Sequence, residues 1–214
     1  MTMIKQRGFT LVEIAVVLVI IGAVLYGLLS SVAIIRSAKA KDIVTIINDL
    51  RTATVYFQQR YGYLPGDLPN PANYINATPA LVQGTGGNIG DGSIDGIVTV
   101  AGIANAGSEV AQAPWQLFNA GLIGTINPST TGNYLNTIYG PVQLVSAFRA
   151  NVLVPGFAAA NPAARNAILF FNLPCDIANE VDIKVDDGSL TTGKGLGSAP
   201  CTGTNPLAVY AITL

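Results

Sequence analysis

The spacing of apolar residues divides the chain into an N-terminal part with helical periodicity and a remainder rich in turn residues. Residues 14–35 form a run of 22 residues without a charged side chain, which ends at Arg36. A helix needs about 20 apolar residues to cross the hydrocarbon core of a bilayer. The run therefore predicts a helix that is apolar nearly all round and long enough to span a membrane.

Helical spacing continues beyond this run, but with an apolar stripe and a polar face. The apolar positions are Ile43, Ile46, Ile47, Leu50 and Phe57. Gly62 can supply a left-handed C-terminal cap, and Pro65 disfavours further helix. We therefore expect one helix over residues 9–61, about 80 Å long at 1.5 Å per residue. A break at Gly22 or Gly27 would instead give two separate helices.

The remaining chain predicts short elements joined by long turns. Turn signals crowd residues 62–113, where we expect an irregular connection with short strands at best, such as residues 96–100. The pattern further predicts a short helix at 113–123, a pair of strands within 138–154, a buried strand at 168–173 and a strand at 209–214. The expected fold class is α+β, with a small antiparallel sheet packed on the second half of the long helix.

Composition narrows the functions that this fold can carry. Histidine is absent, which removes the commonest general base and any Ser-His or Cys-His nucleophile pair. We therefore do not expect an enzyme; a membrane-anchored exported enzyme or binding protein is a remote alternative. The formal net charge of −1 offers no strongly basic surface, so no nucleic-acid partner is expected.

The segment before the apolar run has an unusual order. Its first eight residues, MTMIKQRG, carry two basic side chains and no apolar core. An ordinary secretory signal has its apolar core ahead of the cleavage site and loses it on cleavage. Here the apolar helix follows Gly8-Phe9, so cleavage after Gly8 would leave the helix in the product.

Glu13 is the one carboxylate near the start of the apolar helix. An ionisable group inside a membrane helix costs on the order of 3 kcal/mol, so it usually has a partner. The amine of Phe9, created by cleavage, is the obvious cation, from the same chain or from a neighbour. Alternatively, Glu13 marks the membrane interface.

Over about residues 5–60, this arrangement resembles the type IV pilins and the pseudopilins of type II secretion systems. The resemblance implies that a prepilin peptidase cleaves after Gly8 and methylates Phe9, and that Glu13 acts as the assembly carboxylate. It implies a single-pass inner-membrane protein with a cytoplasmic N-terminus and a periplasmic or extracellular head. An inner-membrane assembly platform would then build a homo-oligomeric helical filament. A pilus subunit is the main expectation, and a pseudopilin of a periplasmic pseudopilus is the alternative.

The expected organisation follows from the resemblance and the pattern together. Residues 1–8 are a cleaved leader, 9–35 a transmembrane and filament-core helix, 36–61 its amphipathic continuation, and 62–214 a globular head.

Two cysteines, Cys175 and Cys201, enclose 25 residues near the end of the sequence. A disulfide commonly closes a C-terminal loop in the family, so the resemblance implies a Cys175–Cys201 bond. Two free buried thiols are the alternative. The cysteines also suggest an oxidising outer compartment for the head.

Calcium is the only cofactor that the sequence raises, at two acidic stretches. Asp91 and Asp95 lie in a segment like a calcium loop, but EF-hand spacing fails and an Asp-Gly turn explains it as well. The second stretch holds Asp182, Asp186 and Asp187. Major pseudopilins carry calcium in their C-terminal loops, so the resemblance raises calcium here; a solvated turn is the alternative.

Residues 188–194 imitate a phosphate-binding loop up to Lys194. Gly195 then stands where a Ser or Thr should hold magnesium, and the residues that follow cannot open a helix. We therefore expect no nucleotide.

Overall fold

The computed structural model describes residues 10–126, 135–201 and 205–214, without the side chains of residues 27–32. The chain separates into two compact units, residues 1–38 and 39–214. Helix α1 comprises Leu11–Tyr61 and has 51 residues. It ends as expected: Gly62 has a φ of 80°, and its N–H donates to the carbonyl of Gln58 over 2.8 Å.

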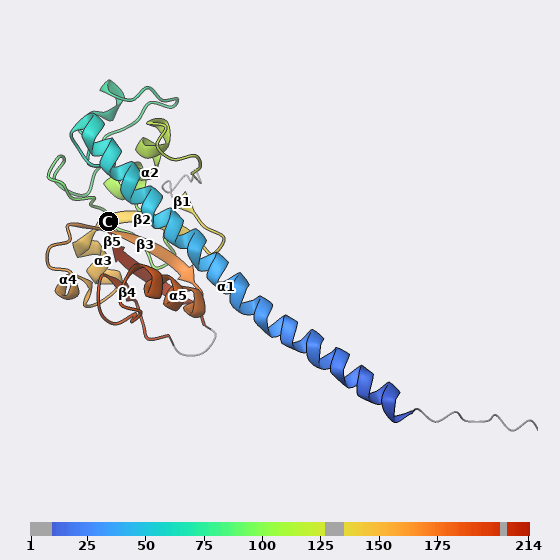
Figure 1. Ribbon diagram of the computed structural model, residues 1–214. Helices are drawn as coiled ribbons and strands as arrows, with labels where there is room; N and C mark the ends of the chain where they lie inside the picture. Colours follow the sequence, from blue (N-terminus) through green and yellow to red (C-terminus); the bar gives the residue numbers. More distant parts are fainter. Residues whose placement is uncertain (1–9, 127–134, 202–204) are drawn as a thin grey trace, which may run out of the picture. The chain divides into compact units, whose positions relative to one another are not determined.

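The second unit contains a five-stranded antiparallel sheet in the order β1-β2-β3-β5-β4 (Figure 1). The strands are β1 (Leu135–Asn136), β2 (Pro141–Ser146), β3 (Asn166–Leu173), β4 (Gly195–Gly197) and β5 (Leu207–Thr213). Strands β3 and β5 confirm the two strands predicted nearest the end of the sequence. The long N-terminal helix and this sheet confirm the α+β class.

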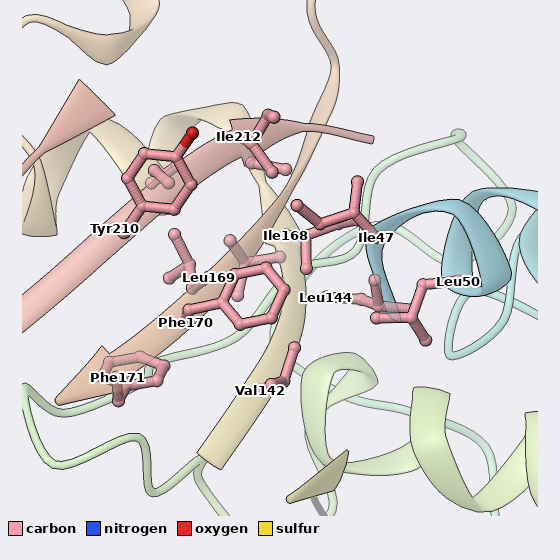
Figure 2. Close-up of a cluster of buried hydrophobic side chains, with 14 of the residues drawn as sticks. Ile47, Leu50, Val142, Leu144, Ile168, Leu169, Phe170, Phe171, Tyr210 and Ile212 are labelled. Atoms are coloured by element: carbon pink, nitrogen blue, oxygen red, sulfur yellow. The ribbon is translucent and has the colours of Figure 1, made fainter. Parts of the chain in front are cut away.

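The core of the second unit forms where the apolar stripe of α1 meets the sheet. Leu144 and Ile168 are register partners on β2 and β3, and both are fully buried. Ile47 and Leu50 of α1 lie beside them (Figure 2). Strands β2 and β3 are buried on both faces, because α1 covers one face and other segments cover the other. The apolar stripe of residues 43–57 is thus explained by its packing in the core of the second unit.

The opposite face is covered partly by the irregular connection. The side-chain amide of Gln143 on β2 donates to the carbonyl of Gly102 over 3.0 Å, and a Cβ at Gly102 would lie 2.9 Å from the Phe171 ring. Within residues 62–113, the structure has the short helix η1 (Pro71–Asn73), the start of α2 and two isolated bridges. The expected irregular connection is confirmed, and the strand predicted at 96–100 is reduced to a bridge between Val98 and Ala104.

Two predicted elements were wrong in type or position. Only the first part of residues 138–154 is a strand, because Ser146 caps a helix there: its Oγ accepts from the backbone N–H of Arg149 over 3.4 Å. That helix is α3 (Ala147–Leu153). The helix predicted at 113–123 is α2 (Glu109–Asn119), which begins earlier because Ser108 caps it. Besides α3 and η1, the helices α4 (Phe157–Ala160) and α5 (Cys175–Val185) were not predicted.

Candidate functional site

The N-terminal candidate site is described from Thr10 onward, so Gly8 and Phe9 lie outside the described residues. Thr10 and Glu13 form reciprocal hydrogen bonds at the start of α1. The backbone N–H and the hydroxyl of Thr10 each donate to Glu13 Oε2 over 2.7 Å, and the N–H of Glu13 donates to Thr10 Oγ1 over 3.3 Å. This is a capping box. Sequence reasoning missed it, although the Thr-x-x-Glu spacing signals it.

The capping box occupies one of the two carboxylate oxygens of Glu13. Both bonds from Thr10 end on Oε2, and Oε1 has no donor among the described residues. The carboxylate also lies in the first turn, where the helix dipole favours negative charge. Glu13 therefore stabilises its own helix start through Oε2, and Oε1 takes no part in the capping box.

The apolar side chains that follow Glu13 are uncovered in the single chain. Large apolar residues between Leu11 and Tyr26 are exposed, from 48% for Ile14 to 86% for Leu11. Contiguous apolar surface of this kind marks an interaction site. Within the part of the chain that the structure describes, none of the helices is both long enough and apolar enough to cross a membrane.

The second candidate site lies in the C-terminal loop, which is closed by the predicted disulfide between Cys175 and Cys201. Helix α5 begins at Cys175 and carries Asp182 on the side that faces β5. There the hydroxyl of Tyr210 donates to Asp182 Oδ1 over 2.9 Å. The disulfide and this buried bond hold α5 against the sheet.

Asp182, Asp186 and Asp187 are brought together as the sequence suggested: each offers an oxygen, and these oxygens lie within 4.8 Å of one another. Asp182 is fully buried, and its Oδ2 has no hydrogen-bond partner among the described residues. Burial raises the pKa of Asp182, and the charges of Asp186 and Asp187 raise it further. A donor set of oxygens with an unpartnered buried carboxylate fits a hard cation such as calcium.

The loop organises the two outer carboxylates through its backbone. Asp186 Oδ2 accepts from the N–H of Gly195 over 2.9 Å and also from the N–H of Lys194. Asp187 accepts from the N–H of Ser189 over 2.9 Å and from the hydroxyl of Thr192 over 2.7 Å. Residues 188–194, which imitate a phosphate-binding loop, therefore donate hydrogen bonds to carboxylates. The segment continues into β4.

The other suggested calcium pair gains no such support. Among the described residues, Asp91 and Asp95 belong to no group of three acidic ligands close enough to share an ion. The backbone N–H of Asp95 instead donates to Glu109 Oε2 over 2.7 Å. The segment around Asp91 and Asp95 therefore acts as a turn that closes on α2.

Two buried carboxylates, Asp67 and Glu109, were not foreseen. Glu109 is fully buried, and its Oε1 has no partner among the described residues. Burial raises the pKa of Glu109 to about 7, and the charge of Asp67 adds to the shift. Asp67 accepts from the N–H groups of Gly90 and Gly92, the latter over 2.8 Å. No periodicity or motif marks these residues, because their partners are backbone groups of an irregular loop.

A comparison with known protein families gives a match at the N-terminal part of the chain, which includes the start of α1. Residues 3–29 match the family model described as the prokaryotic N-terminal methylation motif. This motif is the signature of type IV pilin and pseudopilin families, and it indicates a structural, pilin-like protein. No curated protein and no solved structure matches the chain. The similarity to these families thus rests on the N-terminal motif.

Proposed function

We propose that the chain is a structural subunit of a type IV pilus-like filament, cleaved between Gly8 and Phe9, methylated at Phe9 and assembled through its N-terminal helix. The observation that carries the proposal is the methylation motif at residues 3–29, within which helix α1 begins and exposes its apolar side chains. Neighbouring copies would cover that surface in a heterologous contact repeated along an axis. Before assembly, residues 14–35 would hold the subunit in the inner membrane.

Glu13 would join subunits through the amine of Phe9. The capping box leaves Oε1 free of donors within the described chain, so an ammonium from a neighbour can pair with it without displacing Thr10. A charge-assisted bond is stronger in an apolar surrounding than in water. The same carboxylate would then fix the helix start and set the position of the next subunit.

Processing is tested by the intact mass of the chain from cells that contain active prepilin peptidase. We expect a product that starts at Phe9 and carries one added methyl group. Gly8→Leu should leave uncut precursor, because a bulky side chain obstructs the peptidase. Gly22→Ala is the matched control, since nothing lies within 4 Å of an added Cβ there. A product that still starts at Met1 would contradict the proposal.

Assembly is tested by variants at Glu13. Glu13→Val removes a charge that is costly in an apolar helix, so the variant should be cleaved and membrane-bound yet enter filaments poorly. Glu13→Gln keeps the shape and loses the charge, and it should also be impaired. Filaments sheared from cells that express only the variant provide the measurement. Normal assembly of either uncharged variant would falsify the pairing role.

A pseudopilin of a type II secretion system is the second candidate, favoured by the acidic cluster in the disulfide-closed loop. In this case Asp182, Asp186 and Asp187 would hold calcium, whose two positive charges would offset most of the repulsion among the three carboxylates and fix the loop. Imaging of filaments sheared from native cells separates the candidates: long surface filaments containing the chain support the pilus, and their absence supports the pseudopilus.

Calcium binding is tested on the purified chain. We expect added calcium to raise the midpoint of thermal unfolding, because an ion that binds the folded state alone stabilises it. Asp187→Asn should abolish the rise, whereas Asp49→Asn, an exposed residue of α1 outside the cluster, should retain it. An equal response of the two variants would assign the effect to nonspecific binding.

A further inference from the structure

A cavity of about 490 Å³ opens in the second unit between the second half of α1, the start of β3 and the residue that follows β5. Its walls include Arg51, Thr54 and Gln58 of α1, and Arg165 just before β3. None of the described residues that line it is acidic. The charged side chains among these described residues, Arg51 and Arg165, are therefore both basic.

The two arginines are held by neutral groups and not by carboxylates. Arg51 donates through Nε and Nη2 to the carbonyl of Thr213, over 3.2 and 2.6 Å. Arg165 donates through Nη1 to the backbone carbonyl of Asp91 over 3.1 Å. Within the described chain, neither guanidinium has an ion pair. Burial lowers the pKa of Arg51, which reflects the cost of holding a cation away from water without an anion.

A buried hydroxyl gives a second, independent indication. Thr54 lines the cavity and is only 4% exposed, and its Oγ1 has no hydrogen-bond partner among the described residues. Buried hydroxyls in proteins nearly always have a partner. Leu64 and Val55 provide apolar wall next to these polar groups, as in cavities that bind small molecules.

We propose that this cavity binds a small organic anion, with its carboxylate between Arg51 and Arg165 and its apolar body against Leu64 and Val55. The planar fork of a guanidinium matches the two oxygens of a carboxylate. The hydroxyl of Thr54 donates to the same ligand. The site lies wholly within the second unit, residues 39–214, so it does not depend on filament assembly.

The test uses the full chain in detergent micelles, with benzoate as the probe and benzamide as its neutral isostere. Ligand-observed saturation-transfer NMR should show binding of benzoate and at least about tenfold weaker binding of benzamide, because a charged hydrogen bond is lost. Inorganic phosphate is the competing oxyanion. No detectable benzoate binding, equal binding of benzamide, or displacement by phosphate at concentrations below that of benzoate would each overturn the proposal.

Variants separate the site from nonspecific attraction. Arg165→Gln should weaken benzoate binding about tenfold or more, and Thr54→Val about fivefold. Thr54→Val should also unfold at or above the wild-type temperature, because it removes an unpartnered buried hydroxyl. Arg60→Gln is the matched control on α1, since Arg60 is outside the cavity lining, and it should bind as wild type. Equal weakening by Arg60→Gln and Arg165→Gln would refute the assigned site.

Discussion

The two units of the chain use similar apolar residues in opposite ways. Leu18, in the first unit, is 64% exposed, whereas Leu144 of β2, in the second, is fully buried. A buried core residue derives its stabilising effect from its own chain, at about 25 cal/mol per Å² of apolar surface removed from water. An exposed apolar residue can contribute to stability in this way only where something outside the chain covers it. The difference indicates that the apolar side chains of residues 11–26 leave contiguous apolar surface uncovered, whereas those of the head are covered by the chain itself.

Matched leucines give the strongest test of this contrast. Leu144→Ala should lower the free energy of unfolding of the head by about 2–5 kcal/mol, because it leaves a cavity between α1 and the sheet. Leu18→Ala removes the same atoms from an exposed position and should change it by less than about 0.5 kcal/mol. Urea unfolding of the detergent-solubilised chain, followed by near-UV circular dichroism, measures both. Similar losses for the two variants would break the comparison.

The disulfide is a second difference between the two units, because both cysteines of the chain lie in the head and form a covalent cross-link there. Replacement of Cys175 and Cys201 by Ser should lower the free energy of unfolding by about 3 kcal/mol, as expected for a closed loop of this length. The structure places the lost constraint at the start of α5. Hydrogen exchange should therefore rise first in α5 and β4. Unchanged stability of the double variant would mean that the buried bond between Asp182 and Tyr210 holds the loop alone.

The head should also be the part with a pH-dependent stability near neutrality. Glu109 has a pKa of about 7 in the folded state, above its ordinary value of 4.5. Between these values the unfolded chain has lost a proton that the folded chain keeps, so stability is full below about pH 4.5 and falls as the pH rises through 7. Each pKa unit of difference corresponds to about 1.4 kcal/mol.

Glu109→Gln should flatten this fall, because an amide does not titrate. Unfolding midpoints in urea from pH 4.5 to 8, for wild type and variant, measure the effect. Asp67 and Asp182 also have raised pKa values, so a residual slope in the same direction is expected. An identical slope in both proteins would show that Glu109 is not the group responsible.

The sequence was most informative where one physical demand acts along a continuous segment. The apolar run, the stripe of residues 43–57 and the cap at Gly62 predicted α1 with its end, and the buried run at residues 168–173 predicted β3. The change from strand to helix at Ser146 was missed because Val152 and Val154 suggest a strand. In the structure the side chain of Ser146 caps a helix there instead. Local competition of this kind is not visible in a hydrophobic pattern.

The candidate sites also differ in how far their residues are separated along the sequence. Gly8, Phe9 and Glu13 are predicted as site residues from a contiguous motif, and the cluster of Asp182, Asp186 and Asp187 is nearly contiguous in sequence. The cavity between Arg51 and Arg165, by contrast, joins residues more than a hundred positions apart, and nothing in their local sequence relates them. Only the packing of α1 on the sheet brings them to one place.

The smallest expected effect concerns the capping box, and it separates the two roles of the first helical turn. Thr10→Ala removes the hydroxyl that donates to Glu13 and accepts from its N–H. Loss of an N-cap side chain costs about 1 kcal/mol, and we expect this cost only in the first turns of α1, as faster hydrogen exchange there. The charge of Glu13 remains, so filament assembly should continue, in contrast to Glu13→Gln. If Thr10→Ala assembles as poorly as Glu13→Gln, the helix start itself, and not pairing with a neighbouring amine, is what assembly requires from Glu13.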